Sequence, residues 1–361
     1  MSSTEEFAFD YALLEELTEA RGVPGYEDRI RKIVRRELEP VTDEIRGDAM
    51  GNVVATQHGD ADFEVAISAH MDEIGFMIRY VTEEGFAQLD ALGGWDPRVL
   101  RAQRVTIHTD AGDVPGVLGS VPPHTMDDEE REKTPGVGDV HVDLGLDGER
   151  ARERVRPGDL VTMDQETEVV GDHVTGKALD DRACLFTMIE AARRLDGDSS
   201  GNKGSQPTIH FAASVQEEVG LRGAEALGVD LEPDVAIALD VTVANDVPGF
   251  EAGEHVTDLG EGVAIKLKDS SVITSPKVTD RLREVADDRE IPYQLEVLPA
   301  GGTDTAGFQT GAGATPVGAL SIPTRYLHTV TESAHHEDIA ATISLLTAAL
   351  ETETGEFDYS L

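Results

Sequence analysis

Histidines and acidic residues follow apolar stretches at several points of this 361-residue chain. In VAISAHMDEIG, His70 and Asp72 are two residues apart at the end of a strand-like run, so they share a face if the strand continues. Histidine is the commonest metal-binding side chain, and a ligand histidine usually needs a carboxylate or carbonyl on its other ring nitrogen. The pair is a candidate ligand with its supporting acid, although a strand-end His-x-Asp alone is more often structural.

Three further motifs place acids beside apolar segments. In GKALDDRACL, Asp180 and Asp181 precede a helical pattern, where capping is the ordinary role of an aspartate. In VQEEVG, Glu217 and Glu218 follow a strand-like run, where one could bind a cation and the other handle a proton. Asp240 follows DVAIAL, a run too apolar for a surface strand, and a buried acid needs a partner. Taken alone, Glu217 and Glu218 are explained equally well as exposed surface acids.

Histidines near the C-terminus complete the set. The segment SIPTRYLHTVTESAHHED contains His328, His335 and His336. Open α/β sheets carry their sites at the ends of strands. Acids or histidines at four strand ends and before one helix are therefore better explained by one shared metal site than by separate coincidences.

The segments that must position these residues fall into two kinds. Residues 10–39 have helical spacing, 52–81 are strand-like, and helical and strand-like segments alternate after Gly176. This alternation predicts an α/β domain with helices on both faces of a mixed sheet. Short β-type runs fill 85–168, interrupted by a polar stretch at 122–139 that we expect to be a long mobile loop. Because the segments before this β-rich block belong to the same α/β domain as those after it, the block is an insertion into that domain.

The charge balance excludes some partners. Seventy-one acidic residues against 30 basic ones give a net charge of -41, which disfavours a nucleic-acid partner because phosphate contacts need clustered bases. The N-terminus lacks a signal pattern, and no run reaches the ~20 apolar residues of a membrane helix, so we expect a cytoplasmic protein. Abundant acids with few lysines suit a halophilic cytoplasm, where charges are screened within ~3 Å at about 1 M salt. The single cysteine, Cys184, excludes a multi-thiolate zinc site.

Motifs along most of the chain resemble the tetrahedral (TET-type) aminopeptidases, metallopeptidases that include glutamyl and deblocking aminopeptidases. The matching segments occur in the family's order: AHMDEIGFM (69–77), GSVPPH (119–124), GKALDDR (176–182), QEEVGLRGA (216–224), ALDVT (238–242), GGTDTAG (301–307) and SIPTRYLHT (321–329). The resemblance implies a three-layer, mixed-sheet, zinc-peptidase-like catalytic domain formed by residues 1–73 and 166–361. Residues 74–165 would form an inserted small β-rich dimerisation domain.

The resemblance also implies two divalent metal ions per subunit. The residues that match metal ligands of the family are His70, Asp180, Glu218, Asp240 and His328. His70 and Asp240 would bind one ion, Glu218 and His328 the other, and Asp180 both. The peptide bond between Asp180 and Asp181 is expected to be cis.

Other roles follow from the same resemblance. Glu217 would be the general base, and Asp72 would hydrogen-bond His70. His335 and His336 match no ligand of the family and are expected on the surface. Asp304 lies in a matching motif, with a substrate-pocket or a structural role.

The expected activity is removal of N-terminal residues from peptides by a water that bridges the metals, with Glu217 accepting its proton. A site built only of histidines and carboxylates suits zinc or cobalt, with manganese as a further candidate. By resemblance alone, we expect dimers that assemble into a hollow homo-dodecamer, which would admit peptides and small unfolded chains as substrates.

Two other functions compete with this one. An endoglucanase-like glycoside hydrolase would use two carboxylates without metals, but it would leave the histidines unexplained. Aromatic residues to line a sugar cleft are also scarce, at 5% with one tryptophan, Trp95. A catalytically inactive metal-binding scaffold is the second alternative, and the presence of Glu217 beside the complete ligand set argues against it.

Overall fold

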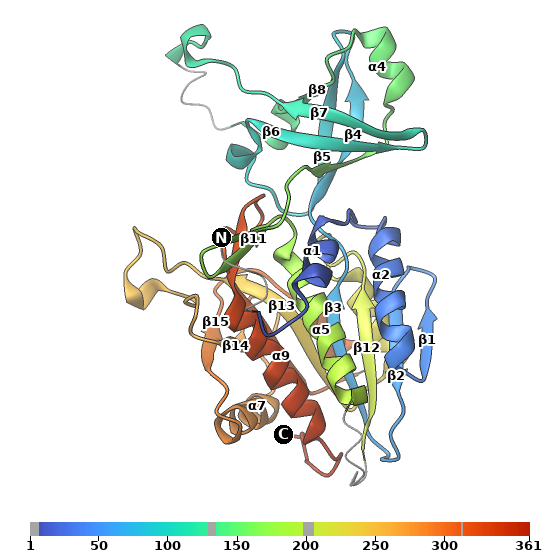
Figure 1. Ribbon diagram of the computed structural model, residues 1–361, viewed down its shortest axis with the longest axis vertical. Helices are drawn as coiled ribbons and strands as arrows, with labels where there is room; N and C mark the ends of the chain where they lie inside the picture. Colours follow the sequence, from blue (N-terminus) through green and yellow to red (C-terminus); the bar gives the residue numbers. More distant parts are fainter. Residues whose placement is uncertain (1–6, 129–134, 198–205, 312) are drawn as a thin grey trace.

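The computed structural model describes residues 7–128, 135–197, 206–311 and 313–361, which form two lobes (Figure 1). The larger lobe is built on an eleven-stranded sheet in the order β1-β2-β12-β3-β13-β16-β17-β11-β10, with β14 and β15 extending beside β16. Its strands are β1 (Glu44–Gly47), β2 (Val53–Gln57), β3 (Glu64–His70), β10 (Glu168–Val170), β11 (His173–Gly176), β12 (Thr208–Ser214), β13 (Val235–Val243), β14 (Val263–Lys268), β15 (Tyr293–Val297), β16 (Val317–Arg325) and β17 (Glu332–His335).

The centre of this sheet is parallel. Strands β12, β3, β13 and β16 run in the same direction, whereas β2 and β14 pair with the centre in antiparallel orientation. The first eight of the nine residues of β13 are buried, and so are those of β16. Burial on both faces explains why these strands are continuous apolar runs without alternation.

Helices cover both faces of the sheet, so the lobe has the three layers that we expected. One core packs Val53, Ile67 and neighbouring side chains against α1 (Tyr11–Glu19), α2 (Asp28–Leu38), α5 (Leu179–Gly197), α7 (Pro276–Asp288) and α9 (His336–Glu351). The other core packs Val54 and Ala66 against α6 (Arg222–Leu231) and α8 (Thr305–Thr310). The side chains of neighbouring residues in a strand thus pack into opposite cores.

The smaller lobe is a closed antiparallel barrel in the order β4-β5-β8-β7-β6-β9. It comprises β4 (Gly75–Val81), β5 (Phe86–Leu92), β6 (Gln103–Thr109), β7 (Gly112–Leu118), β8 (His141–Asp143) and β9 (Leu160–Met163), with α4 (Gly148–Arg154) beside them. The barrel has its own apolar core, in which Phe76 stacks on Trp95. The mixed α/β fold with a small β insertion is therefore confirmed.

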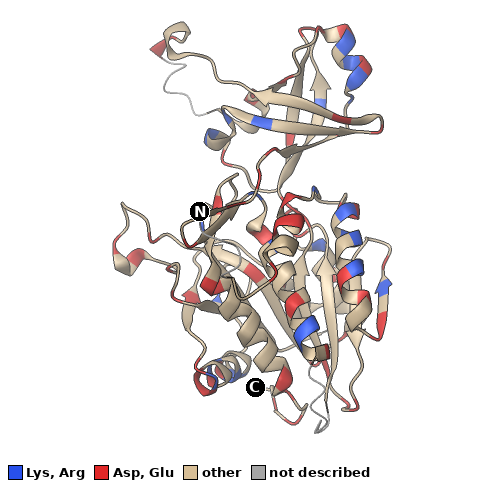
Figure 2. Ribbon diagram, in the orientation of Figure 1, with Lys and Arg blue, Asp and Glu red and all other residues tan. Residues whose placement is uncertain are grey.

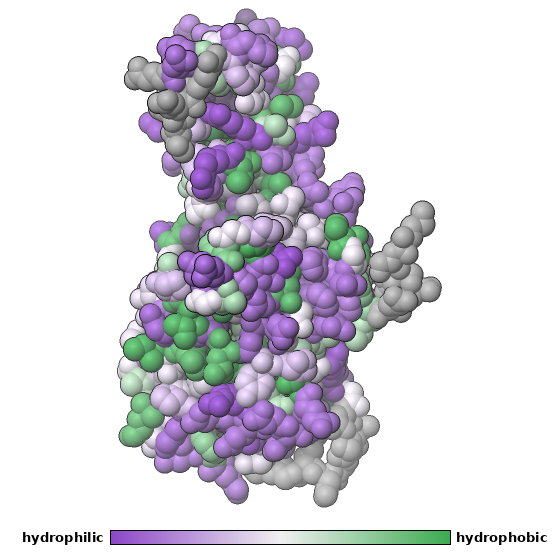
Figure 3. All heavy atoms as spheres, turned by 90° about the vertical axis from the view of Figure 1, so that its left-hand side faces the viewer, coloured by the Kyte–Doolittle hydropathy of each residue, from purple (hydrophilic) through white to green (hydrophobic). Residues whose placement is uncertain are grey.

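The polar stretch 122–139 differs from a plain loop at its described ends. They form short 3-10 turns at Pro123–Thr125 and Val137–Asp139, while residues 129–134 lie outside the described part. Acidic residues are spread over both lobes (Figure 2), and hydrophilic residues dominate the face in Figure 3, with apolar patches mainly on the larger lobe. Every helix among the described residues is too short or too polar to span a membrane.

Candidate active site

The predicted site residues meet at the edge of the sheet from which β3 leads into the barrel. His70 is the last residue of β3, Glu217 and Glu218 follow β12, and Asp180 lies in the first turn of α5. His328 comes from the segment after β16. Because parallel strands place their carboxyl ends at one edge of a sheet, residues separated by up to 258 positions become neighbours.

Donor atoms gather in two groups that share Asp180. One consists of His70, Asp180, Asp181 and Asp240, the other of Asp180, Glu218 and His328, and the donor atoms of each group lie within 4.8 Å of one another. Asp180 directs one carboxylate oxygen to each group. Oδ1 lies 3.1 Å from Nε2 of His70, and Oδ2 lies 3.3 Å from Nε2 of His328. This arrangement has the composition and the shared carboxylate of a dinuclear centre.

Asp240 lies inside β13, whereas the sequence placed it at the end of this strand. The strand continues to Val243 because β16 pairs with it through this region, with Asp240 opposite Ser321. The Asp240 side chain is almost fully buried, and it belongs to the first donor group.

Backbone groups lie against both histidines. Nδ1 of His70 lies 3.0 Å from the carbonyl oxygen of Asp72, which directs Nε2 toward Asp180. Gly94, a residue between β5 and β6 of the barrel, lies against the ring of His328. A Cβ at Gly94 would lie 3.0 Å from Nδ1 of His328, so a side chain there would crowd the imidazole. The barrel therefore contributes to the site.

The Asp72 carboxylate lies beside His70 and also holds the two glutamates. Its nearest oxygen is 3.6 Å from Nδ1 of His70, whereas the two oxygens accept the backbone amides of Glu217 and Glu218 at 3.1 Å each. Asp72 thus supports His70 mainly through its carbonyl, and it holds the two glutamates through its side chain.

Two further acids near the site were not assigned from the sequence. Asp181 accepts the backbone amide of His70 at 3.1 Å, and the Asp180–Asp181 peptide bond is cis, as expected. Glu332 accepts the amides of Asp180 and His328. These acids occur in motifs crowded with carboxylates, and hydrogen bonds to the backbone of distant residues leave no pattern in a sequence.

Asp304 and the last two histidines have structural contacts. The buried Asp304 accepts hydrogen bonds from Ser68 at 2.7 Å and Ser214 at 2.5 Å, which ties β3 to β12. His335 and His336 belong to neither donor group, but they are half-buried instead of lying freely on the surface. The Nδ1 atom of His335 accepts the Glu337 amide and caps α9.

The buried, closely spaced carboxyl groups of the cluster favour bound cations. Burial raises the pKa of Glu217, Glu218 and Asp240, and neighbouring carboxylates raise it further. Burial acts the same way on Asp180, but hydrogen bonds from His328 and His70 outweigh it and lower the pKa of that carboxyl. Among the described residues, the buried Oε1 of Glu218 has no hydrogen-bond partner. An orphaned carboxylate oxygen inside such a donor set fits a divalent metal ion.

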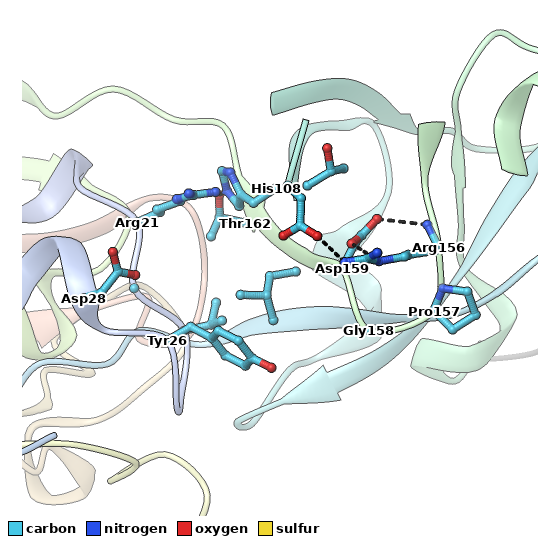
Figure 4. A pocket seen from close by; sticks show the side chains of 14 residues that line it. Arg21, Tyr26, Asp28, His108, Arg156, Pro157, Gly158, Asp159 and Thr162 are labelled. Atoms are coloured by element: carbon cyan, nitrogen blue, oxygen red, sulfur yellow. Dashed lines mark hydrogen bonds and ion pairs between the residues drawn. The ribbon is translucent and has the colours of Figure 1, made fainter. Parts of the chain in front are cut away.

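A separate cavity of about 320 Å³ lies at the junction of the lobes (Figure 4). Arg21 pairs there with Asp113 at 3.3 Å, and Arg156 pairs with Asp110 and Asp159. The lining thus carries its own counter-charges, and the cavity is apart from the donor groups.

Comparison with known proteins agrees with this geometry. The model of the family described as M42 glutamyl aminopeptidase matches residues 51–345. The chain is 36% identical to lysyl aminopeptidase of Pyrococcus furiosus, over 95% of this chain and 97% of that protein. A TET aminopeptidase from a marine sediment thaumarchaeon superposes with a TM-score of 0.90 at 33% identity, covering 95% of this chain and 96% of that one.

The TET1 peptidase of Pyrococcus horikoshii, which can assemble into a tetrahedron or a large octahedral shell, has a TM-score of 0.82 at 32% identity, with 94% and 98% covered. A Thermotoga maritima structure solved under the name endoglucanase is less similar, with a TM-score of 0.74 at 26% identity over 93% and 96%. The family match overrules the glycoside hydrolase reading. The chain belongs to the M42 glutamyl aminopeptidase family and is a metal-dependent aminopeptidase.

Proposed function

We propose that five residues hold two divalent metal ions and that Glu217 is the general base of N-terminal residue removal. The proposed ligands are His70, Asp180, Glu218, Asp240 and His328. The observation that carries this proposal is the position of Asp180, whose two oxygens face His70 on one side and His328 on the other. A carboxylate shared by two donor groups is what a pair of neighbouring cations requires.

The chain's own residues supply positioning and proton transfer. When bound, two divalent ions would polarise the scissile carbonyl and lower the pKa of water. Glu217 lies beside both donor groups, with Oε2 4.0 Å from Nε2 of His70. There it accepts the proton of the attacking water and returns it to the departing amine. Burial raises the pKa of Glu217, which suits a group that must both take and release a proton near neutral pH.

The donor set favours zinc or cobalt, with manganese as a further candidate. Imidazole and carboxylate ligands suit these ions, and the buried Cys184 is in neither donor group. A site without thiolates is typical of catalytic centres that keep a position open for substrate.

The barrel is the proposed dimerisation domain, spanning residues 74–165 between the catalytic segments 1–73 and 166–361. Tyr80, Phe86 and Val117 leave 52%, 38% and 48% of their surface exposed on this barrel. Exposed apolar side chains on a small barrel support an interface with a second copy. By likeness to the Pyrococcus horikoshii TET1 peptidase, we propose that the dimers build a homo-dodecamer whose substrates are short peptides.

The charge of the chain supports a particular cellular environment. A net charge of -41 with seven lysines suits a cytoplasm with concentrated salt, where self-repulsion is screened over ~3 Å at about 1 M. We therefore propose a halophilic cytoplasmic enzyme whose activity needs molar KCl.

The experiment compares wild type with Glu217→Gln on a panel of aminoacyl p-nitroanilides in molar KCl. Each protein is chelated and then reconstituted with zinc, cobalt or manganese. The exposed Glu225 on α6 provides the matched control, Glu225→Gln. We expect metal-dependent turnover in wild type and control, and a fall of about 10²–10⁴-fold in kcat for Glu217→Gln.

Metal binding by Glu217→Gln, measured by calorimetry, should stay at two ions per subunit. Turnover by Glu217→Gln at the wild-type rate would remove Glu217 from the role of base. Binding of two ions without any turnover by wild type would instead favour the inactive scaffold.

A further inference from the structure

Glu332 connects two of the proposed ligands through their backbone. Oε2 accepts the amide of Asp180 at 3.1 Å, and Oε1 accepts the amide of His328 at 2.8 Å. The side chain is 1% exposed, at the start of β17, where Glu332 pairs with Gly176 of β11. Glu332 therefore holds the start of α5 and the segment after β16 at a fixed separation.

The carboxylate of Glu332 makes both contacts. Each amide binds a different oxygen, and a carboxylate offers both oxygens in one plane. A glutamine would keep one acceptor and turn an NH₂ group toward the other amide, which places donor against donor. Asp72 accepts the amides of Glu217 and Glu218 with its two oxygens in the same way. The same kind of carboxylate contact therefore holds two of the segments that carry ligands.

The distance between the segments that Glu332 joins also sets the distance between donor atoms of the proposed metal site. Oδ2 of Asp180 and Nε2 of His328 lie 3.3 Å apart, and Oε2 of Glu218 is 3.7 Å from the same nitrogen. Partners that orient metal ligands from behind are worth about 10–100-fold in metal affinity. A shift of either backbone segment would change the distance between the donors directly.

We propose that Glu332 is a positioning residue that fixes Asp180 and His328 relative to each other and thereby sets the affinity of the metal ion they would share with Glu218. This inference rests on the proposed ligand set. Glu332 belongs to neither donor group, so its effect would reach the reaction only through the positions of the two ligands.

The test compares Glu332→Gln with a control that has the same chemistry elsewhere. The buried Asp338 at the start of α9 accepts the amides of Gly260 and Gly262 at 2.8 Å each. Neither glycine is a proposed ligand or lies next to one in the sequence. Asp338→Asn thus loses the same kind of bidentate contact without touching the site.

Metal affinity is measured on the full chain in molar KCl by competition with a chelating dye, using zinc and cobalt alone. The visible spectrum of the cobalt form reports ligand geometry, and thermal unfolding reports stability. For Glu332→Gln we expect the affinity of one of the two ions to fall about 10–100-fold, with an altered cobalt spectrum. For Asp338→Asn we expect a lower unfolding temperature with wild-type affinity and spectrum.

Two results would overturn the inference: wild-type affinity for both ions in Glu332→Gln, or an equal loss in Asp338→Asn. If Glu332→Gln does not fold, Glu332→Asp replaces it, because the shorter acid reaches at most one amide and should weaken the same ion. Wild-type affinity in Glu332→Asp would then refute the proposal. If wild type itself binds no pair of ions, the proposed ligand set fails first, so the two failures are distinguishable.

Discussion

A buried ion pair next to the candidate site gives the sharpest test of stability. Lys266 on β14 and Glu296 on β15 have fully buried side chains and pair directly. Thr242 on β13 also donates to Oε1 of Glu296 at 2.7 Å. Oε2 of Glu296 has no hydrogen-bond partner among the described residues. The carboxylate is therefore held by one cation and one hydroxyl, and Lys266→Met would remove the cation while keeping most of the volume.

The expected loss follows from what remains buried. Removing one partner of a buried pair costs about 3–5 kcal/mol, because the other charge is left without compensation. Thr242 still donates to Glu296, so we expect the lower part of that range, about 3–4 kcal/mol. At about 2.1 cal/mol/K per residue, the entropy of unfolding 361 residues is roughly 0.8 kcal/mol/K. The unfolding temperature should therefore fall by about 4–5 °C.

Scanning calorimetry at low and at molar KCl measures this shift. Lys32→Met is the matched control, because Lys32 is 78% exposed and lies 3.7 Å from Asp28, and it should cost under about 0.5 kcal/mol. The loss in Lys266→Met should persist in molar salt, since buried charges are screened far less than exposed ones. Lys266→Met/Glu296→Leu should recover most of it, except about 1 kcal/mol for the unpaired hydroxyl of Thr242. Equal stability of the two single variants would refute the reasoning.

Two further predictions concern metal removal and pH. Chelation should abolish peptidase activity and lower the unfolding temperature, and zinc should restore both: activity should saturate once the sites are filled, while stability should keep rising with the logarithm of the zinc concentration. An unchanged unfolding temperature would contradict a metal-stabilised carboxylate cluster. Burial lowers the pKa of His108, which lies 2.9 Å from Asp113 and 2.8 Å from Thr162, so the folded protein binds fewer protons than the unfolded chain near pH 6.5. Stability should therefore fall as pH drops below about 6.5, and His108→Gln should remove this component in denaturant unfolding at pH 5 and pH 8.

Elements with strong local patterns could be predicted from the sequence. The helical spacing of 178–195 and 275–289 corresponds to α5 and α7, and FAQLDAL is β5 from its first residue to its last. Strand β14 was missed because Lys266 interrupts its apolar run. That lysine is buried only because Glu296 lies opposite on β15. A partner supplied by another strand cannot be read from the run itself.

The candidate site was predictable to the level of residue types. The acids and histidines at strand ends do come together, because the parallel order of β12, β3 and β13 places their ends at one edge. How far β13 continues past Asp240 could not be foreseen, because the pairing with β16 decides where that strand ends. The contact of Gly94 with His328 depends on how the barrel sits on the larger lobe, which no local pattern encodes.

The acids around the site divide into two kinds, and this division explains why a motif alone assigns them incompletely. Asp72 and Glu332 bind backbone amides at the site, whereas Glu218 and Asp240 belong to the donor groups. Asp181 belongs to a donor group and also accepts the backbone amide of His70. A carboxylate bound to amides is stabilised by dipoles, so it can remain buried without competing for a cation. Replacing such an acid by its amide should therefore shift where the ions sit, while replacing a ligand should remove an ion altogether.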